Sequence, residues 1–408
     1  MAMSDKELYT ELRRRVMEKS DICCAGGGED ERLFGLIDEA ICEYARSSHL
    51  TLSQRIKARK QVFASIRGFG VIQELLEDPD ITEIMVNGPG RIFFEKDGRI
   101  SRFEGEFEDE RQLSDLVQKI AAGANRVINE ASPIVDARLP ADGSRVNLVL
   151  PPVALNGPIV TIRKFPKEIM TLERLIELGS VDAETAEFLR RAIRAKLNIV
   201  ISGGTGTGKT TFLNALSGCI PSDERVITIE DSAELQLNGI ENLVTLEARN
   251  SNVEGRNGVS IRDLIKTALR MRPDRIVVGE VRDGACIDML QALNTGHSGM
   301  STGHANSTAD MLSRMETMCL LGADIPISAV RRQIASAIDL MIHLGRFRDK
   351  TRKVVEITEV AGYEHDEIVL NTLYKFEELG EKEGHIEGKL IPTGNPVIRT
   401  DKFRAAGL

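Results

Sequence analysis

Residues 199–211, IVISGGTGTGKTT, constrain the fold of this chain more than any other segment. An apolar run ends in the spacing G-x-x-x-x-G-K-[ST], and a helical pattern follows it. The fixed positions of this spacing are Gly203, Gly208, Lys209 and Thr210. The pattern is typical of a phosphate-binding loop, whose glycines let successive N–H groups point at a phosphate while the next helix directs its positive end there. Because strand and helix patterns flank the motif, a chance glycine-rich turn is a poor alternative.

This loop predicts ATP and Mg²⁺ as the bound cofactors. Lys209 is placed to reach the β- and γ-phosphate oxygens, and the Thr210 hydroxyl is placed to hold Mg²⁺. The expected nucleotide-binding residues are Gly204, Thr205, Gly206, Thr207, Gly208, Lys209, Thr210 and Thr211.

The composition is that of a soluble globular protein, with 408 residues, of which 42% are hydrophobic and 28% charged. This length predicts two or three domains. The formal charge of -9 argues against a role dominated by nucleic acid, which needs clustered Lys and Arg. The charged N-terminus argues against a secretory signal, and no segment has the roughly 18 uninterrupted apolar residues of a spanning helix. We expect a cytosolic protein that contacts the membrane through a partner.

The six cysteines do not form a metal-binding or disulfide pattern. Cys23 and Cys24 are adjacent, the others are scattered, and none forms a C-x-x-C pair. We therefore predict free thiols, no disulfide and no structural metal.

The first two regions are a helical segment over residues 1–67 and an α/β domain over residues 68–170. In the first, Thr51 and Gln54 resemble a capping box, and GGGED at 26–30 separates two helices. In the second, strand patterns are separated by turn signals such as Asn87-Gly88. The predicted strands cover 81–86, 91–94, 145–150 and 159–164, and a helical pattern runs from Leu113 to Ile128.

The third region is a linker helix over residues 171–180, followed by a motor domain over residues 181–408. Thr171 caps the linker helix and Gly179 ends it. Short apolar strands then alternate with helical patterns, which predicts crossover units and a mostly parallel sheet. The predicted strands cover 199–202, 226–230, 275–280, 300–302 and 340–344.

Polar residues stand where these strands end, which is where nucleotides bind in such sheets. Glu230, Asp231 and Glu234 follow one strand; Glu280 ends the next and Arg282 follows it. His297 and His304 lie in TGHSGMSTGHANS. An ATPase needs carboxylates near Mg²⁺ and the attacking water, and donors to the γ-phosphate. Singly each residue is a weak signal, but their order behind a phosphate loop is specific.

Four segments in this order resemble the type II/IV secretion-system ATPases. GGTGTGKTT, ITIEDSAEL, LRMRPDRIVVGEVRD and TGHSGMSTGHANS are similar to the Walker A motif, Asp box, Walker B motif and His box of that superfamily. The segment ADGSRVNLVLPPVALNGPIVTIRKF looks like the domain boundary of the CpaF branch, which drives Flp-type (tight-adherence) pilus assembly. The resemblance covers roughly Glu74 to Ile342, and no motif assigns residues 1–67 or the tail after about 346.

The resemblance implies an α/β fold, with a RecA-like phosphate-loop motor domain preceded by a smaller α/β domain and a helical segment. It implies a homohexameric ring in which ATP binds between the two domains. The expected partners are polytopic platform proteins of the inner membrane, at which the cytoplasmic motor docks, and no nucleic acid is expected to bind directly. Such a motor powers pilus assembly or protein secretion by ATP hydrolysis.

The family's catalytic residues map onto this chain. The resemblance implies that Glu280 completes the outer shell of Mg²⁺ through water, that Glu230 acts on the attacking water and that His304 senses the γ-phosphate. Family members leave room for either glutamate to be the general base.

Four arginines are added by the same resemblance. Arg145 and Arg163 look like N-terminal-domain arginines that close on the nucleotide. Arg272 looks like a finger that reaches the next subunit's site, and the resemblance implies that Arg282 braces Glu280.

Three other classes of protein compete with this interpretation. A regulatory GTPase would carry N-K-x-D, which is not evident, and an ABC-type motor would carry an LSGGQ-like signature, which does not appear. A nucleic-acid motor, including a conjugative DNA-translocating ATPase with the same four boxes, is disfavoured by the acidic balance, the absence of Trp and only four Tyr.

Overall fold

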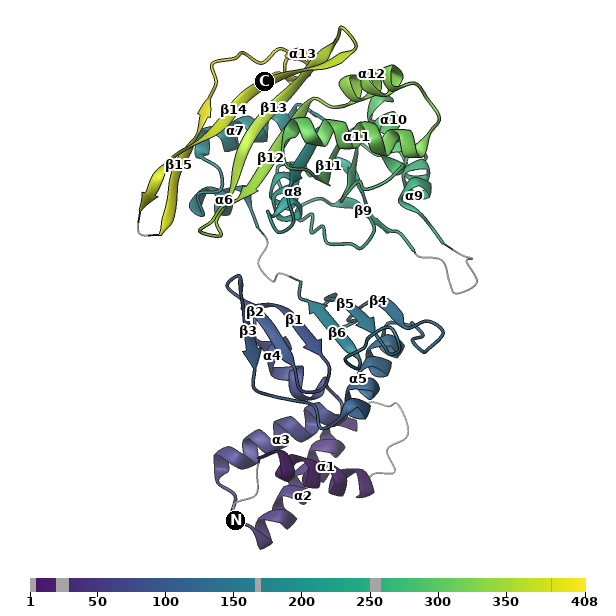
Figure 1. Cartoon of the computed structure of the whole chain (residues 1–408), viewed down its shortest axis with the longest axis vertical. Coiled ribbons are helices and arrows are strands. Elements are labelled where there is room, and N and C mark those ends of the chain that lie inside the picture. The colour runs from purple at the N-terminus through teal and green to yellow at the C-terminus, as the bar shows by residue number, and fades with distance from the viewer. Residues whose placement is uncertain (1–4, 20–28, 166–169, 250–257, 383) are drawn as a thin grey trace. The chain divides into compact units, whose positions relative to one another are not determined.

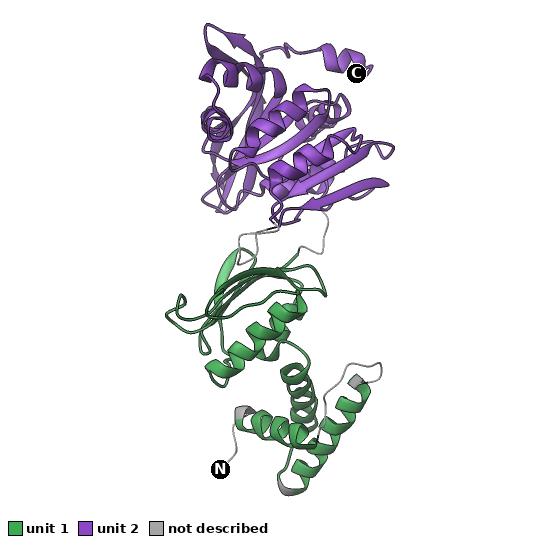
Figure 2. Cartoon of the chain, turned by 90° about the vertical axis from the view of Figure 1, so that its right-hand side faces the viewer, with its two compact units in different colours: residues 1–167 green, residues 168–408 purple. Residues whose placement is uncertain are grey.

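The computed structural model describes residues 5–19, 29–165, 170–249, 258–382 and 384–408. The chain divides into two compact units, Met1–Lys167 and Glu168–Leu408 (Figure 2). The finer boundaries at residues 67, 170 and 180 stay predictions. Cys23, Cys24 and the glycines at 26–28 lie outside the described residues.

The first unit begins with three helices, α1 (Asp5–Lys19), α2 (Glu29–Ser47) and α3 (Leu52–Ile66). They share a core in which Leu12 and Ile37 are fully buried. The capping box predicted at the start of α3 is confirmed: the Thr51 hydroxyl accepts from the Gln54 N–H, and the Gln54 side chain accepts from the Thr51 N–H.

The rest of the first unit is an antiparallel sheet in the order β3-β2-β1-β6-β5-β4. Two short helices, η1 (Gly70–Ile72) and α4 (Gln73–Glu77), precede it, and α5 (Glu110–Gly123) lies between β3 and β4 in the chain. The strands are β1 (Ile81–Asn87), β2 (Ile92–Lys96), β3 (Arg99–Phe103), β4 (Ile134–Arg138), β5 (Arg145–Val149) and β6 (Ile159–Arg163). The predicted helix to Ile128 is too long, because Asn125 has a φ of 54° and the chain leaves the helix before it.

The second unit is built on a nine-stranded sheet in the order β15-β14-β13-β12-β7-β11-β10-β8-β9, within the described part of the chain (Figure 1). The strands from β12 to β9 in this order are parallel, as predicted. They are β7 (Ile199–Gly203), β8 (Arg225–Glu230), β9 (Asn242–Glu247), β10 (Arg275–Val278), β11 (Ser298–His304) and β12 (Leu340–Arg346).

Helices cover both faces of the parallel strands (Figure 1). On β7, Ile199 and Ile201 pack into a core shared with α6 (Leu172–Glu177), α7 (Ala183–Arg194) and α8 (Lys209–Ser217). Val200 points the other way, into a core shared with four further helices. These are α9 (Ile261–Ala268), α10 (Ala285–Asn294), α11 (Thr308–Gly322) and α12 (Ile327–Ala337). Because both faces are buried, the strand is continuously apolar rather than alternating.

Three antiparallel strands extend the sheet beyond β12, and the sequence did not predict them. They are β13 (Arg352–Glu364), β14 (Glu367–Lys382) and β15 (His385–Pro392), followed by α13 (Asp401–Ala405). The edge strand β9 was also not predicted. The strand expected over 275–280 ends at Val278, so Glu280 lies on the loop that follows it.

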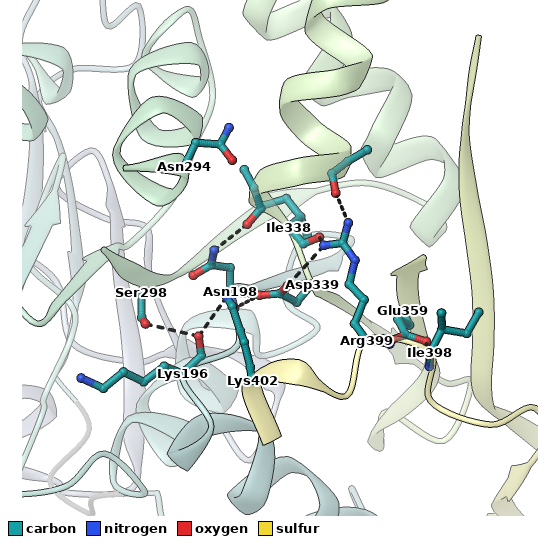
Figure 3. Close-up of polar contacts among 12 residues, drawn as sticks. Lys196, Asn198, Asn294, Ser298, Ile338, Asp339, Glu359, Ile398, Arg399 and Lys402 are labelled. Carbon is teal, nitrogen blue, oxygen red and sulfur yellow. Dashed lines mark hydrogen bonds and ion pairs between the residues drawn. The ribbon is translucent and has the colours of Figure 1, made fainter. Parts of the chain in front are cut away.

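A buried carboxylate ties the C-terminal segment to the amino edge of the parallel strands (Figure 3). Asp339, 5% exposed, accepts from the backbone N–H of Asn198 at 2.7 Å, from Arg399 at 3.3 Å and from Lys402 at 2.6 Å. Asn198 in turn accepts from the Gly299 N–H at 3.0 Å. This network fixes where β7, β11 and β12 begin, at the end of the sheet opposite the glycine-rich loop.

Among the described residues, no helix combines the length and apolarity that crossing a membrane requires. Cys286 and Cys319 are buried as free thiols between the helices of the second unit.

Candidate active site

The glycine-rich loop leaves β7 at Gly203 and enters α8 at Lys209. A Cβ on Gly203 would lie 2.6 Å from the Thr207 hydroxyl and 2.7 Å from the Leu344 carbonyl oxygen, so only glycine fits there. Gly208, the N-cap of α8, has a φ of 88°, a conformation that glycine adopts without strain. The loop is therefore held in a tight turn whose N–H groups and helix N-terminus form an anion site.

Lys209 lies within this turn and is only 8% exposed. Its ammonium donates to the carbonyls of Gly203 at 3.1 Å and Gly204 at 2.9 Å. It also lies 3.2 Å from Nδ1 of His304, the last residue of the neighbouring strand β11. Burial lowers the pKa of Lys209, because it disfavours the charged form of the ammonium.

His304 connects the loop to the carboxylate of Glu280. Nε2 of His304 lies 3.1 Å from Oε1 of Glu280, and Oε2 of Glu280 accepts from Nε and Nη2 of Arg282 at 2.9 and 2.6 Å. Asp231, the residue after β8, lies 3.7 Å from Arg282. Lys209, His304, Glu280 and Arg282 therefore form one row of polar contacts along the carboxyl edge of the sheet.

The charges in this row fix the form of the imidazole. Burial and the neighbouring Lys209 lower the pKa of His304 below its ordinary value, so the ring is neutral at pH 7. The ammonium of Lys209 can only donate, so Nδ1 accepts and the ring proton resides on Nε2, where it is donated to Glu280.

Glu230, the other predicted catalytic carboxylate, has a different environment. It is 3% exposed, and its Oε1 accepts from the backbone N–H groups of Glu234 at 2.8 Å and Leu235 at 3.0 Å. A Cβ on Gly279 would lie 2.8 Å from Cγ of Glu230, so the glycine before Glu280 leaves room for this side chain. Glu230 thus shapes the loop of residues 231–235, and the side chain of Glu234 takes no part in that contact.

A cavity of about 520 Å³ adjoins the loop. The residues that line it are Gly204, Thr205, His304, Ala305, Asn306, Asp310, Ser313 and Arg314. The loop backbone and His304 therefore face a space large enough for a bound ligand.

Thr210 and Glu280 are the oxygen donors predicted to hold Mg²⁺. Thr210 is the second residue of α8 and is half-buried, and the Glu280 side chain is 19% exposed. One hydroxyl and one carboxylate suit Mg²⁺, which prefers oxygen and keeps several waters beside a bound phosphate. The part of the chain that the structure describes has no group of three or more His, Cys, Asp and Glu able to hold a metal.

Of the other residues singled out in the sequence, three lie outside this row within the second unit and two belong to the first unit. Arg145 and Arg163 belong to the first unit, where they are direct partners across β5 and β6. Arg272 is exposed with a φ of 55° and precedes β10, so it lies at the amino edge of the sheet, opposite the loop. His297 likewise precedes β11 and contacts the Ala292 carbonyl at 3.2 Å. Thr211 is on α8 with an exposed side chain.

Residues 66–376 match the family model described as type II/IV secretion system protein. The chain belongs to the type II/IV secretion system family. With the phosphate loop at residues 203–210, it is an ATPase of this family.

Two relatives show which members of the family this secretion ATPase is similar to. A putative conjugal transfer protein of Mycobacterium tuberculosis is 38% identical over 298 residues, which cover 72% of this chain and 84% of the relative. The type IV secretion system protein PtlH of Bordetella pertussis is 36% identical over 310 residues, covering 69% and 91%. Among solved structures, the ATPase DotB of Legionella pneumophila has a TM-score of 0.50 at 23% identity, covering 70% and 78%, a likeness of fold alone.

Two arginines of the secretion ATPase lie against the phosphate loop. The sequence did not predict that they belong to the site. Arg352 Nε donates to the Gly206 carbonyl at 2.9 Å, and a Cβ on Gly206 would lie 3.4 Å from Arg346 Nη1. The available signal was the basic run RFRDKTRK at 346–353, which directly follows a predicted strand. The run gives no indication of its partner, because 146 residues separate Arg352 from Gly206.

Proposed function

We propose that this secretion ATPase hydrolyses ATP at the loop of residues 203–210 to power a conjugal-transfer or type IV secretion apparatus. The observation that carries the proposal is the row of contacts from Lys209 through His304 to Glu280 and Arg282. Such a row places a cation, a neutral hydrogen-bonding ring and a carboxylate beside one phosphate loop, as triphosphate hydrolysis requires. The names of the 38% and 36% identical relatives support this class of machine.

In this proposal the loop N–H groups and Lys209 hold the β- and γ-phosphates. Thr210 and, through water, Glu280 hold Mg²⁺, which neutralises charge on the phosphate oxygens when bound. The Nε2–H of His304 moves from the Glu280 carboxylate to the γ-phosphate, so Glu280 responds to the presence of that phosphate.

Glu280 is the better candidate for orienting and deprotonating the attacking water. Its carboxylate lies on the row that begins at Lys209 and its side chain is 19% exposed, whereas Glu230 is 3% exposed and is held by the backbone N–H groups after β8. Water attacks the γ-phosphorus, its proton passes to the carboxylate, and the bond to the ADP oxygen breaks. Glu230 then acts as a positioning residue for the loop after β8.

We further propose a RecA-like motor domain that works in a homohexameric ring. Arg145 and Arg163, side by side on neighbouring strands, close on the nucleotide from the first unit, and hydrolysis loosens that clamp. The position of Arg272 supports a role between subunits. Its side chain is exposed and lies at the amino edge of the sheet, remote from the phosphate loop of the same chain. Closure that depends on the γ-phosphate converts hydrolysis into movement.

The motor is proposed to work in the cytoplasm, docked through the N-terminal helices on polytopic inner-membrane platform proteins, without direct contact to nucleic acid. Flp-type pilus assembly is a second candidate, supported by the resemblance of residues 141–165 to the CpaF branch. Strong, length-dependent stimulation of ATP turnover by DNA would instead favour a nucleic-acid translocating motor.

Lys209→Ala tests the proposed activity. We expect this variant to lose ATP binding and turnover, because the phosphates lose their buried cation. Lys389→Ala, which removes an exposed lysine of β15, is the matched control and should behave as wild type. ATP turnover by the Lys209→Ala protein at the wild-type rate would refute the site.

A further inference from the structure

The phosphate loop has a second cationic wall on the side away from His304. In the sheet β7 lies between β11 and β12, so Gly203 is paired with His304 on one side and with Leu344 on the other. Arg346 ends β12 and Arg352 begins β13, and the two are direct partners across this antiparallel pair. The turn between them therefore brings both arginines to the carboxyl edge, on the flank opposite the row formed by His304 and Glu280.

Both arginines contact the tip of the loop. Arg352 donates through Nε to the Gly206 carbonyl at 2.9 Å, and its Cδ would lie 3.3 Å from a Cβ on Gly208. Arg346 Nη1 would lie 3.4 Å from a Cβ on Gly206. These distances place both arginine side chains against the turn.

No carboxylate among the described residues pairs with Arg346. The acid nearest to it in the turn is Asp349, which accepts from the Thr351 N–H and hydroxyl and from the Ile386 N–H. By contrast, Arg348 in the same turn pairs with Glu378 at 2.6 Å and Glu381 at 2.9 Å, away from the loop. The exposed Arg346 thus adds positive charge to a helix N-terminus and a buried lysine, an arrangement that a bound anion stabilises.

We infer that Arg346 binds the diphosphate portion of the nucleotide and that Arg352 is a positioning residue that holds the loop for it. The inference rests on the proposed function and extends the site to a segment that carries no motif. Because Arg346 lies on the flank opposite His304, it contacts oxygens that ATP and ADP share. A guanidinium suits this role because its planar fork donates to two phosphate oxygens at once.

The experiment compares the dissociation constants of ADP and ATP, each with Mg²⁺, measured by titration calorimetry on the full chain. Arg346→Ala should weaken both nucleotides by the same factor, roughly tenfold, the equivalent of one charge-assisted hydrogen bond. His304→Ala should weaken ATP more than ADP. Arg348→Ala, the matched control from the same turn, should leave both constants unchanged.

Conservative variants separate binding from positioning. Arg346→Lys should recover part of the affinity because it restores a charge. Arg352→Lys should not recover the affinity lost in Arg352→Ala, because lysine has no N–H at the Nε position of the stem. All these variants should melt at the wild-type temperature without nucleotide.

Three results would overturn the inference. They are dissociation constants of Arg346→Ala within about twofold of wild type, a weakening of ATP binding alone in that variant, or an equal loss of nucleotide affinity in Arg348→Ala. Retained binding in Lys209→Ala would instead refute the proposed function, so the two failures are distinguishable.

Discussion

Nε2 of His304 lies 3.1 Å from Oε1 of Glu280, and this contact links the end of β11 to the loop after β10. The other ring nitrogen lies 3.2 Å from the Lys209 ammonium. A neutral imidazole accepts on one side and donates on the other, so one ring connects the Lys209 ammonium to the Glu280 carboxylate. The phosphate loop and the carboxylate are therefore joined through a single side chain.

Glu280 and Glu230 are predicted to differ in their effect on hydrolysis. Glu280→Gln should keep ATP affinity and lower turnover about 10²- to 10⁴-fold, because an amide cannot take the proton of water. Glu230→Gln should retain more turnover, because an amide oxygen still accepts from the Glu234 and Leu235 N–H groups. Single-turnover rates at saturating ATP measure both, and the reverse ranking would make Glu230 the base.

The pH dependence of the protein is predicted from His304 and His343. Burial lowers the pKa of both below the ordinary 6.5. The unfolded chain therefore binds more protons than the folded protein once the pH falls through about 6.5, so stability is fully present above that pH and decreases below it. Melting temperatures between pH 8 and 5 should show this decrease. A melting temperature that rises on acidification would contradict the assignment.

The decrease of ATP turnover at acidic pH tests the protonation of His304 separately from the stability of the fold. Turnover should fall only at a pH below 6.5, where the ring gains a proton and no longer accepts from Lys209. In His304→Gln the rate should be lower, and that decrease should be absent. A decrease that persists in the variant would assign it to another group.

Arg163→Ala should lower ATP turnover at least tenfold, on the order of one arginine contact to phosphate, while the first unit stays folded. The reason is that the proposed clamp loses one of its two cations. Arg99→Ala, an exposed arginine on β3 of the same sheet, is the control. Turnover in Arg163→Ala equal to that of the control would remove this arginine from the site.

The buried pair of Arg275 and Glu224 is predicted to matter for stability. Arg275 is fully buried and donates to Glu224 at 2.5 and 3.1 Å. Glu224→Ala should destabilise the second unit by about 3–5 kcal/mol, because it leaves a buried guanidinium without its counter-charge. Arg190→Ala breaks exposed pairs with Glu187 and Glu173 and should cost about 0–1 kcal/mol. Urea midpoints of the two variants measure the difference, and equal midpoints would contradict the prediction.

The parallel part of the fold was predictable because its signals are local. The run at 199–202 is continuously apolar, helical patterns separate it from the next strands, and Thr51 and Thr171 cap their helices as expected. The antiparallel strands β13 to β15 escaped prediction. Within the sheet they pair with one another and with β12, and they carry many charged residues, as in EIVLNTLYKFEELGEK of β14. Half-exposed strands of this kind lack the apolar run of a buried strand.

The sequence by itself determined the phosphate loop, because the spacing of Gly203, Gly208, Lys209 and Thr210 acts within one turn of chain. The sequence also indicated which polar residues follow the strands. Only the tertiary structure decided which of them meet: Glu280 joins His304 and Lys209, Glu230 turns to backbone N–H groups, and Arg346 and Arg352 reach the loop. These contacts depend on the order of strands in the sheet, which sets neighbours far apart in the chain side by side, and no local pattern encodes that order.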